Sequence, residues 1–408
     1  MNIEEIERLD KSDPLKAKAE EFYLPDGQVY LDGNSLGAMP LAAKQRLQDV
    51  VTREWGEDLI HSWNDNDWFI QPGRIGDKIA QLIGANEGEV IVSDCVSVNI
   101  FKSVMAALKL QGERTQIVTE LGNFPTNLYV LQGIEKMLGG KVELVAVERE
   151  RVLESISDKT AIVVLTHTHY KTSEVFDMAE YTDCAHQQGA MILWDLCHSA
   201  GVMPLDLAGL DVDMSVGCGY KYLNGGPGAP AFVSVASRLQ AKLEQPVSGW
   251  WSHAMPFAFN DQYSPAEDIR QMQSGTQSVL GLAALEVGID MALSVEMSQV
   301  REKSSALGQV FIKLVKAFCP ELEIASPIED EHRGSHVSIS HGEGYAITQA
   351  LRQRGITVDF RAPDIIRFGF APLYNSYRDC WDTVQALREI LQSGEWDEPQ
   401  YKQKATVT

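Results

Sequence analysis

Two side chains of opposite charge stand at the ends of apolar runs in the middle of the chain. Asp195 closes the run "AMILWD", and Lys221 lies farther along in "GCGYKYLNGGPG", between two tyrosines and before a glycine-rich turn. A lysine amine can form a Schiff base with an aldehyde, and a buried carboxylate needs a cation or several hydrogen-bond donors. Pyridoxal phosphate would satisfy both, because its aldehyde bonds to a lysine and its ring nitrogen pairs with an acidic side chain. On these residues alone, a solvated surface lysine and a helix-capping aspartate remain alternatives.

A phosphate group would need a binding place of its own. Ser97 lies at the start of a predicted helix in "DCVSVNIFKSV", where a hydroxyl and free backbone amides could bind an anion, although a plain helix cap also explains this serine. Phe124 in "NFPTN" could stack on a ring or anchor a loop in the core. His198, close after Asp195, could contact a cofactor or be a satisfied structural histidine.

Short β-branched runs separated by helix-length segments are the elements that must position these side chains. The runs cover residues 89–94, 116–120, 142–147, 161–167, 190–195 and 229–235, and residues 97–110 and 173–189 have apolar positions at helical spacing. This alternation predicts an α/β fold with a mostly parallel sheet covered by helices. Ligands bind at the carboxyl ends of the strands in such a sheet, and the candidate residues do follow the predicted strands.

The pattern changes after about residue 285 to a long helical stretch and then short strands, which predicts a smaller α+β domain. We therefore expect three parts: an N-terminal segment over residues 1–50 that packs with the small domain, a large cofactor-binding domain over 51–285, and a small C-terminal domain over 286–408.

Composition excludes some partners. The 408 residues carry a net charge of -22, which argues against nucleic acid and against an anionic membrane surface. No apolar run approaches the roughly 20 residues that a membrane helix needs, and the N-terminus lacks the plan of an export signal. The six cysteines are scattered, which is typical of free thiols in a reducing cytoplasm. His167 and His169 share one face of a predicted strand without a third ligand at suitable spacing, so we expect no metal.

Nine segments, in order along nearly the whole chain, resemble kynureninases. They are "YLDGNSLGAMP" (30–40), "HSWNDNDWF" (61–69), "VSVNIFK" (96–102), "NFPTN" (123–127), "LTHTHYKTSE" (165–174), "DLCHSAGVMPLDL" (195–207), "GCGYKYLNGGPGAPAF" (217–232), "GWWSHAMPFAF" (249–259) and "IIRFGFAPLYNS" (365–376). The stretches around Lys221 and Arg367 are the most specific. The resemblance implies a pyridoxal-phosphate enzyme of the aspartate-aminotransferase fold (fold type I, with a seven-stranded sheet). It also implies a homodimer with shared active sites and hydrolysis of L-kynurenine to anthranilate and L-alanine.

The resemblance also implies roles for individual residues. Lys221 would bond to the cofactor and move the proton at the substrate Cα, Tyr220 would contact the phosphate and donate a proton, and Asp195 would pair with the ring nitrogen. Arg367 is similar to the arginine that holds the substrate carboxylate, a task suited to a guanidinium. Further cofactor contacts are implied for Val96, Ser97, Phe124, Asn127, Thr166 and His198, for Trp250 and Thr276 from the neighbouring subunit, and substrate contacts for Asn34, Ser35, His61 and Trp63.

This chain departs from the family pattern at several of these segments. Asn127 stands where an aspartate is expected, which removes one negative charge near the cofactor. His169, Ser173 and Cys197 replace an expected asparagine, glycine and alanine, and "GTQSVL" lacks the expected prolines after Thr276. Lys221 and Asp195 are unchanged, so the cofactor and the reaction class are more firmly predicted than the substrate.

Two other classes of function remain open. The first is a hydrolase or lyase that acts on another β-substituted amino acid, although desulfuration would require a cysteine aimed at the substrate, and no cysteine is an obvious candidate. The reaction that the resemblance implies is itself expected to include 3-hydroxy-L-kynurenine as a substrate. A regulator that binds the cofactor without catalysis would usually carry a basic DNA-reading domain, and neither end of the chain has the charge for one.

Overall fold

The computed structural model describes residues 1–404, which form two compact units. The large unit contains Ala43–His167 and Phe176–Ser294, and the small unit contains Met1–Ala42, Thr168–Val175 and the described chain from Val295 onward. The division into 1–50, 51–285 and 286–408 stays a prediction. None of the described helices is both long and apolar enough to span a bilayer.

The large unit is built on a seven-stranded sheet with the strand order β4-β10-β9-β8-β7-β5-β6. Only β10 runs antiparallel to its neighbours, which confirms the mostly parallel sheet predicted from the alternation. The strands are β4 (Val90–Val92), β5 (Gln116–Glu120), β6 (Glu143–Val147), β7 (Thr160–Thr166), β8 (Met191–Asp195), β9 (Met214–Cys218) and β10 (Ala231–Val235). Every residue of β7 and β8 is buried, as expected of central strands with helices on both faces.

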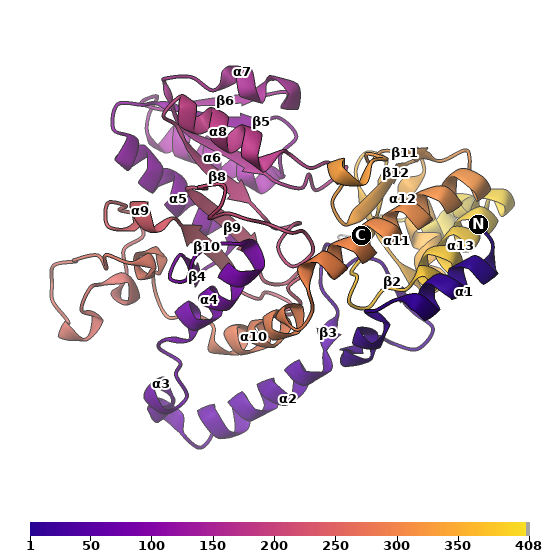
Figure 1. The fold of residues 1–408 in the computed structure, drawn as a ribbon, viewed down its shortest axis with the longest axis horizontal. Helices are drawn as coiled ribbons and strands as arrows, with labels where there is room; N and C mark the ends of the chain where they lie inside the picture. The colour runs from indigo at the N-terminus through magenta and orange to yellow at the C-terminus, as the bar shows by residue number, and fades with distance from the viewer. Residues whose placement is uncertain (405–408) are drawn as a thin grey trace. The chain divides into compact units, whose positions relative to one another are not determined.

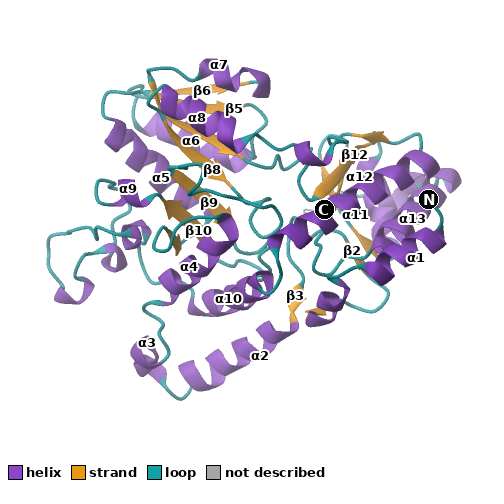
Figure 2. Ribbon diagram, viewed as in Figure 1, coloured by secondary structure: helices purple, strands orange, loops and turns teal. Residues whose placement is uncertain are grey.

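Helices enclose this sheet, and Figure 2 shows its strands in orange among them. They are α4 (Gln71–Ile83), α5 (Val96–Gln111), α6 (Pro125–Met137), α7 (Val152–Ser155), α8 (Met178–Gln187), α9 (Ser237–Gln240) and α10 (Val279–Leu293). Two helices that precede them in the chain, α2 (Leu41–Asp49) and α3 (Ser62–Asp65), lie away from the strands in Figure 2. The helix predicted from residue 173 begins only at Met178. The reason is local: Asp177 accepts a hydrogen bond from the backbone N of Glu180 and caps the helix there, and Ser173 has a φ of +67° that no α-helix accommodates.

The small unit has a four-stranded antiparallel sheet in the order β11-β12-β15-β14. Its strands are β11 (Glu323–Ile324), β12 (His336–Ser340), β14 (Asp359–Arg361) and β15 (Ile365–Gly369), and its helices are α1 (Ile3–Ser12), α11 (Met297–Phe318), α12 (Gly344–Gln353) and α13 (Tyr377–Ser393). Short pairs join β1 (Phe22–Tyr23) to β3 (Met39–Pro40) and β2 (Val29–Tyr30) to β13 (Ile356–Thr357). Helix α1 lies beside α13, where the backbone N of Tyr377 donates to Asp10, and Figure 1 shows this indigo helix against the yellow one.

Candidate active site

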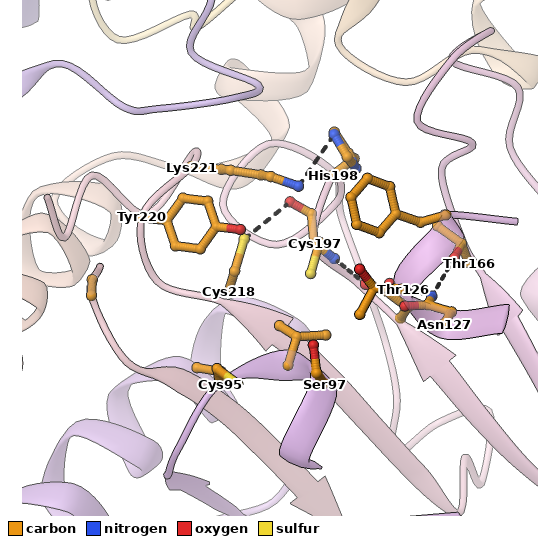
Figure 3. Close-up of a pocket in the computed structure, with 15 residues that line it drawn as sticks. Cys95, Ser97, Thr126, Asn127, Thr166, Cys197, His198, Cys218, Tyr220 and Lys221 are labelled. Atoms are coloured by element: carbon orange, nitrogen blue, oxygen red, sulfur yellow. Dashed lines mark hydrogen bonds between the residues drawn. The ribbon is translucent and has the colours of Figure 1, made fainter. Parts of the chain in front are cut away.

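A pocket opens at the carboxyl edge of the large unit's sheet (Figure 3). Residues from the ends of β4, β5, β7, β8 and β9 line it, because the carboxyl ends of strands running in one direction meet at one edge. The structure thus brings together Val96, Ser97, Phe124, Asn127, Thr166, Asp195, His198, Tyr220 and Lys221.

Asp195 is the last residue of β8 and is only 3% exposed. Its Oδ1 accepts a hydrogen bond of 2.9 Å from the backbone N of Cys197, and its Oδ2 accepts one of 2.8 Å from Nδ2 of Asn127. Such donors offset the cost of burying a carboxylate. The bond from Cys197 is a local turn bond of the capping kind, whereas the bond from Asn127 comes from a distant part of the chain.

Asn127 lies at the centre of a buried polar network. Its Nδ2 is also 3.2 Å from Oγ1 of Thr166 and 3.2 Å from Oδ1 of Asn123, and the Thr166 hydroxyl donates to the same Asn123 oxygen at 2.6 Å. The buried Oδ1 of Asn127 has no hydrogen-bond partner among residues 1–404. An unpaired buried oxygen that lines a pocket is costly unless a ligand supplies a donor.

Lys221 is half-buried and points into the pocket (Figure 3). Its Nζ is 3.4 Å from Nε2 of His198 and 5.9 Å from the ring centroids of Phe124 and Tyr220. The turn before it requires glycine at 219, because a Cβ there would lie 2.6 Å from the backbone O of Pro230. The close contact between the backbones at 219 and 230 fixes the path of the chain after β9, and with it the positions of Tyr220 and Lys221.

The Tyr220 hydroxyl is held in its protonated form. Burial, followed by the nearby Cys218, Cys197 and Asp195, raises the pKa of Tyr220 above its ordinary value of 10.0. The Tyr220 hydroxyl therefore carries its proton at neutral pH. The buried Cys197 thiol is inert by the same logic, since its hydrogen bond with Cys218 and its burial raise its pKa well above 9.0.

The far end of the pocket suits an anion. Helix α5 starts at Val96, and its N-cap residue, Cys95, makes no side-chain capping hydrogen bond. The first-turn N–H groups and the Ser97 hydroxyl therefore adjoin the pocket together with the positive end of the helix dipole. An amine, a buried carboxylate, an unpaired amide oxygen and this anion site in one pocket fit pyridoxal phosphate.

Several predicted residues of the large unit lie outside the pocket. Trp250 and Thr276 are exposed and do not line it. His61 is exposed at the end of a short 3-10 helix, Leu59–His61. Trp63 is half-buried, and its ring packs edge-on against those of Trp250 and Trp251 at centroid distances of 6.2 and 5.5 Å.

The remaining three predicted residues lie in the small unit. Arg367 on β15 is 1% exposed; its Nη2 donates to Oγ of Ser35 at 2.9 Å and its Nη1 to the backbone O of Tyr170 at 2.6 Å. Asn34 is fully buried with no partner for either side-chain polar atom within the described chain. Its Oδ1 would lie 1.8 Å from a Cβ at Gly369, so only glycine fits at that position.

Sequence reasoning missed two charged residues beside Arg367. Asp359 bonds to Nε of Arg367 at 2.7 Å and also contacts its Nη2, while Arg361 bonds to the same carboxylate at 2.8 Å. Burial opposes ionisation of Asp359, but the bonds from Arg367 outweigh it and lower the pKa of Asp359 to about 2. The signal was available, because an aspartate within the apolar run "ITVDF" is as unusual as Asp195 within "AMILWD".

Comparison with known proteins agrees with the resemblance. The family described as "Kynureninase C-terminal domain" matches residues 300–387. The chain is 45% identical to a kynureninase of Burkholderia pseudomallei (strain 1106a) over 99% of each chain, and 46% identical to a kynureninase of Pseudomonas fluorescens over 98% of each chain.

Among solved structures the likeness is one of fold. The cysteine desulfurase CsdA of Escherichia coli superposes with a TM-score of 0.78 at 19% identity, over 93% of this chain and 98% of that one. The cystine C-S lyase C-DES superposes with a TM-score of 0.76 at 16% identity, over 89% of this chain and 98% of that one. These similarities confirm the predicted fold type I architecture. At 45% identity over nearly the full length, with its most specific motifs on the pocket and on β15, the chain belongs to the kynureninase family.

Proposed function

We propose that this chain hydrolyses the Cβ–Cγ bond of L-kynurenine, and of 3-hydroxy-L-kynurenine, to give anthranilate or 3-hydroxyanthranilate and L-alanine. Kynureninases are pyridoxal-phosphate-dependent hydrolases that cleave a carbon–carbon bond. The observation that carries the proposal to this chain is one pocket that holds Lys221, the buried Asp195 carboxylate and the uncapped start of α5.

Different residues of the pocket would bind different parts of the cofactor. Asp195, fixed by Asn127 and Cys197, would pair with the ring nitrogen, and Phe124 and His198 would flank the ring, with Thr166 supporting Asn127. Val96 and Ser97 would bind the phosphate at the start of α5. When bound, the cofactor supplies an electron sink that stabilises negative charge at the substrate Cα.

Lys221 and Tyr220 would handle the protons. Lys221 moves a proton at the substrate Cα, and His198 at 3.4 Å keeps its amine in position. Hydrolysis leaves Cβ in need of a proton when anthranilate departs. Tyr220 is the proposed donor, since its protonated hydroxyl lines the same pocket as Lys221.

Arg367 would bind the substrate α-carboxylate, and Asn34, Ser35, His61 and Trp63 would lie toward its aryl end. Support for Arg367 comes from its setting: Ser35, Asp359 and Tyr170 hold a guanidinium that is 1% exposed in one fixed orientation. The two unpaired polar atoms of the buried Asn34 side chain could bond a substrate group.

We also propose a homodimer in which Trp250 and Thr276 of one subunit contact the cofactor phosphate of the other. The large unit exposes apolar side chains that a partner would cover, namely Leu59 (57%), Ile60 (71%), Phe257 (63%) and Phe259 (84%). We also propose a cytoplasmic location, which the scattered free cysteines support. The proposed role is in tryptophan catabolism or NAD biosynthesis.

The test is direct. Purified protein loaded with pyridoxal phosphate is mixed with L-kynurenine, and anthranilate fluorescence is followed, with 3-hydroxykynurenine in parallel and Lys221→Ala as the control. Rapid release that is lost in the control is expected. A protein that binds the cofactor yet releases no aromatic product from either substrate would refute the proposal and direct the search to other β-substituted amino acids.

A further inference from the structure

A fully buried lysine on α5 has no part in the chemistry proposed above. Lys102 is 0% exposed, and its Nζ donates to Oδ2 of Asp94 at 2.7 Å, to Oγ of Ser93 at 3.1 Å and to the backbone O of Met272. Burial lowers the pKa of Lys102, and the Asp94 carboxylate opposes that effect. A buried ammonium is costly even when it is paired, so this one calls for an explanation.

The contacts of this ion pair converge on the segment 272–277. Oδ1 of Asp94 accepts a hydrogen bond of 3.1 Å from Oγ of Ser274, and the backbone N of Asp94 donates to Oε1 of Gln277 at 3.1 Å. With the Lys102 bond to Met272, the segment is held before and after Thr276. Thr276 itself is exposed between two anchored residues.

The same segment also fixes Trp250. The backbone N of Trp251 donates to the backbone O of Ser274 at 3.3 Å. A Cβ on residue 249 would lie 2.1 Å from that same oxygen. Only glycine at position 249 therefore lets the backbone come this close to Ser274. Ser274 is therefore the common support of Trp250 and Thr276, two exposed residues that do not line the pocket of their own chain.

We infer that the Lys102–Asp94 pair is a positioning device that acts on the other subunit: it holds Trp250 and Thr276 in place to complete the cofactor site of the partner. This inference rests on the proposed homodimer and its shared sites. The competing explanation is an effect within the same chain, because Asp94 also precedes Val96 and Ser97, which line the chain's own pocket.

Heterodimers separate the two explanations. Two differently tagged chains are co-expressed and purified through both tags. In the first pairing, Lys102→Met is combined with Lys221→Ala. One site then has an intact Lys221 from the first chain and an intact 272–277 segment from the second. In the second pairing, a wild-type chain is combined with a chain that carries both substitutions. The only intact Lys221 then comes from the wild-type chain, and the 272–277 segment that serves its site comes from the chain that lacks Lys102.

Action on the partner predicts near half of wild-type activity in the first pairing and, in the second, near half of the low activity of the Lys102→Met homodimer. Action within the chain predicts the reverse, because the second pairing contains one fully wild-type chain. The reverse result, equal activities, or a monomeric wild-type protein would overturn the inference. Lys109→Met, which removes an exposed lysine from the same helix, is the matched control and should leave both pairings unaffected.

A second measurement, of cofactor retention, tests the inference without depending on which substrate the protein cleaves. Only a chain with Lys221 gives the visible absorbance of lysine-linked pyridoxal phosphate, so retention of this absorbance after dialysis is measured in both pairings. About tenfold weaker retention is expected wherever the altered segment serves the intact lysine, from the loss of hydrogen bonds to charged groups. If wild type fails to release anthranilate but the retention pattern holds, the proposed reaction fails and this inference stands. Should Lys102→Met not fold, Ser274→Ala, which leaves no buried charge unpaired, is tested in the same pairings.

Discussion

The side-chain amide of Asn127 donates a hydrogen bond of 2.8 Å to Oδ2 of Asp195, so the neutral residue that departs from the family pattern is bonded directly to the carboxylate proposed to bind the cofactor ring. Asn127 is 1% exposed and Asp195 is 3% exposed. In this chain Asp195 therefore has a fixed donor on Oδ2, where a second carboxylate would have to share a proton with it.

Asn127→Asp should make the cofactor-free protein less stable at pH 8 than at pH 5, relative to wild type. Two buried carboxylates in contact cannot both ionise, and a proton is scarcer at the higher pH, so we expect a penalty of about 2 kcal/mol at pH 8 that shrinks at pH 5. Urea unfolding at the two pH values measures it. Adding Asp195→Asn restores a single carboxylate and should remove the pH dependence; an equal penalty at both pH values would contradict the argument.

Tyr220→Phe should lower kcat for kynurenine by about 100-fold at saturating cofactor, because a positioned general acid contributes on that order. The fold should be unaffected, since the ring is retained. Steady-state kinetics measure the effect, with Tyr222→Phe on the same turn as the control that should stay near wild type. If Tyr220→Phe kept the wild-type kcat, another group would have to be the proton donor.

Arg367→Lys should raise KM for kynurenine by at least about tenfold with a smaller change in kcat, because a lysine cannot reproduce the planar group that the bonds to Asp359, Ser35 and Tyr170 hold in one orientation. The same change at Arg354, which pairs with Glu389 and Glu395 in the same unit, serves as the control. Equal effects of the two substitutions on KM would count against a substrate role for Arg367.

Asp32→Asn should alter how stability depends on pH. Burial, followed by repulsion from Asp359, raises the pKa of Asp32 from 3.8 to about 7. The folded protein thus holds this proton more tightly than the unfolded chain, and stability falls as the pH rises from about 4 to about 7. Asp359, whose pKa is lowered to about 2, contributes stability that is lost only as the pH falls below about 4, so it does not mask this effect.

Urea unfolding of the cofactor-free protein at pH 5 and pH 8 measures the Asp32 effect. Asp32→Asn should remove a decline on the order of 2 kcal/mol between these values. Asp26→Asn, on the exposed turn that precedes β2, should keep the wild-type decline. An unchanged decline in Asp32→Asn would assign it to other groups.

Most strands of the large unit were predictable from the sequence. Residues 116–120 and 190–195 were expected as strands, and β5 and β8 agree to within a residue, because both contain neighbouring apolar residues that a central strand buries. The strand β9 was expected only as an apolar run before Lys221, and no bounds were predicted for it. Its sequence "MSVGC" holds only one β-branched residue, and its burial depends on neighbours from distant parts of the chain.

The composition of the site was predictable, but its contacts were not. The rule that ligands bind at the carboxyl ends of strands brought Ser97, Phe124, Thr166 and Asp195 together from sequence alone. The bond between Asn127 and Asp195 depends on the directions of side chains from different strands. The hydrogen bond from Lys102 to Met272 depends on a loop more than a hundred residues away in the sequence. No local pattern encodes such distances.

Helix α5 contributes its first turn to the pocket of its own chain and, later in the same helix, the lysine that fixes the 272–277 segment. Under the proposed arrangement, vitamin B6 supply and subunit association become thermodynamically linked. If the second subunit makes the binding free energy of the cofactor more favourable, the bound cofactor makes the free energy of dimerisation more favourable by the same amount. A cell short of the vitamin would then hold more of this protein as separate chains, and refilling the pocket would itself drive reassembly.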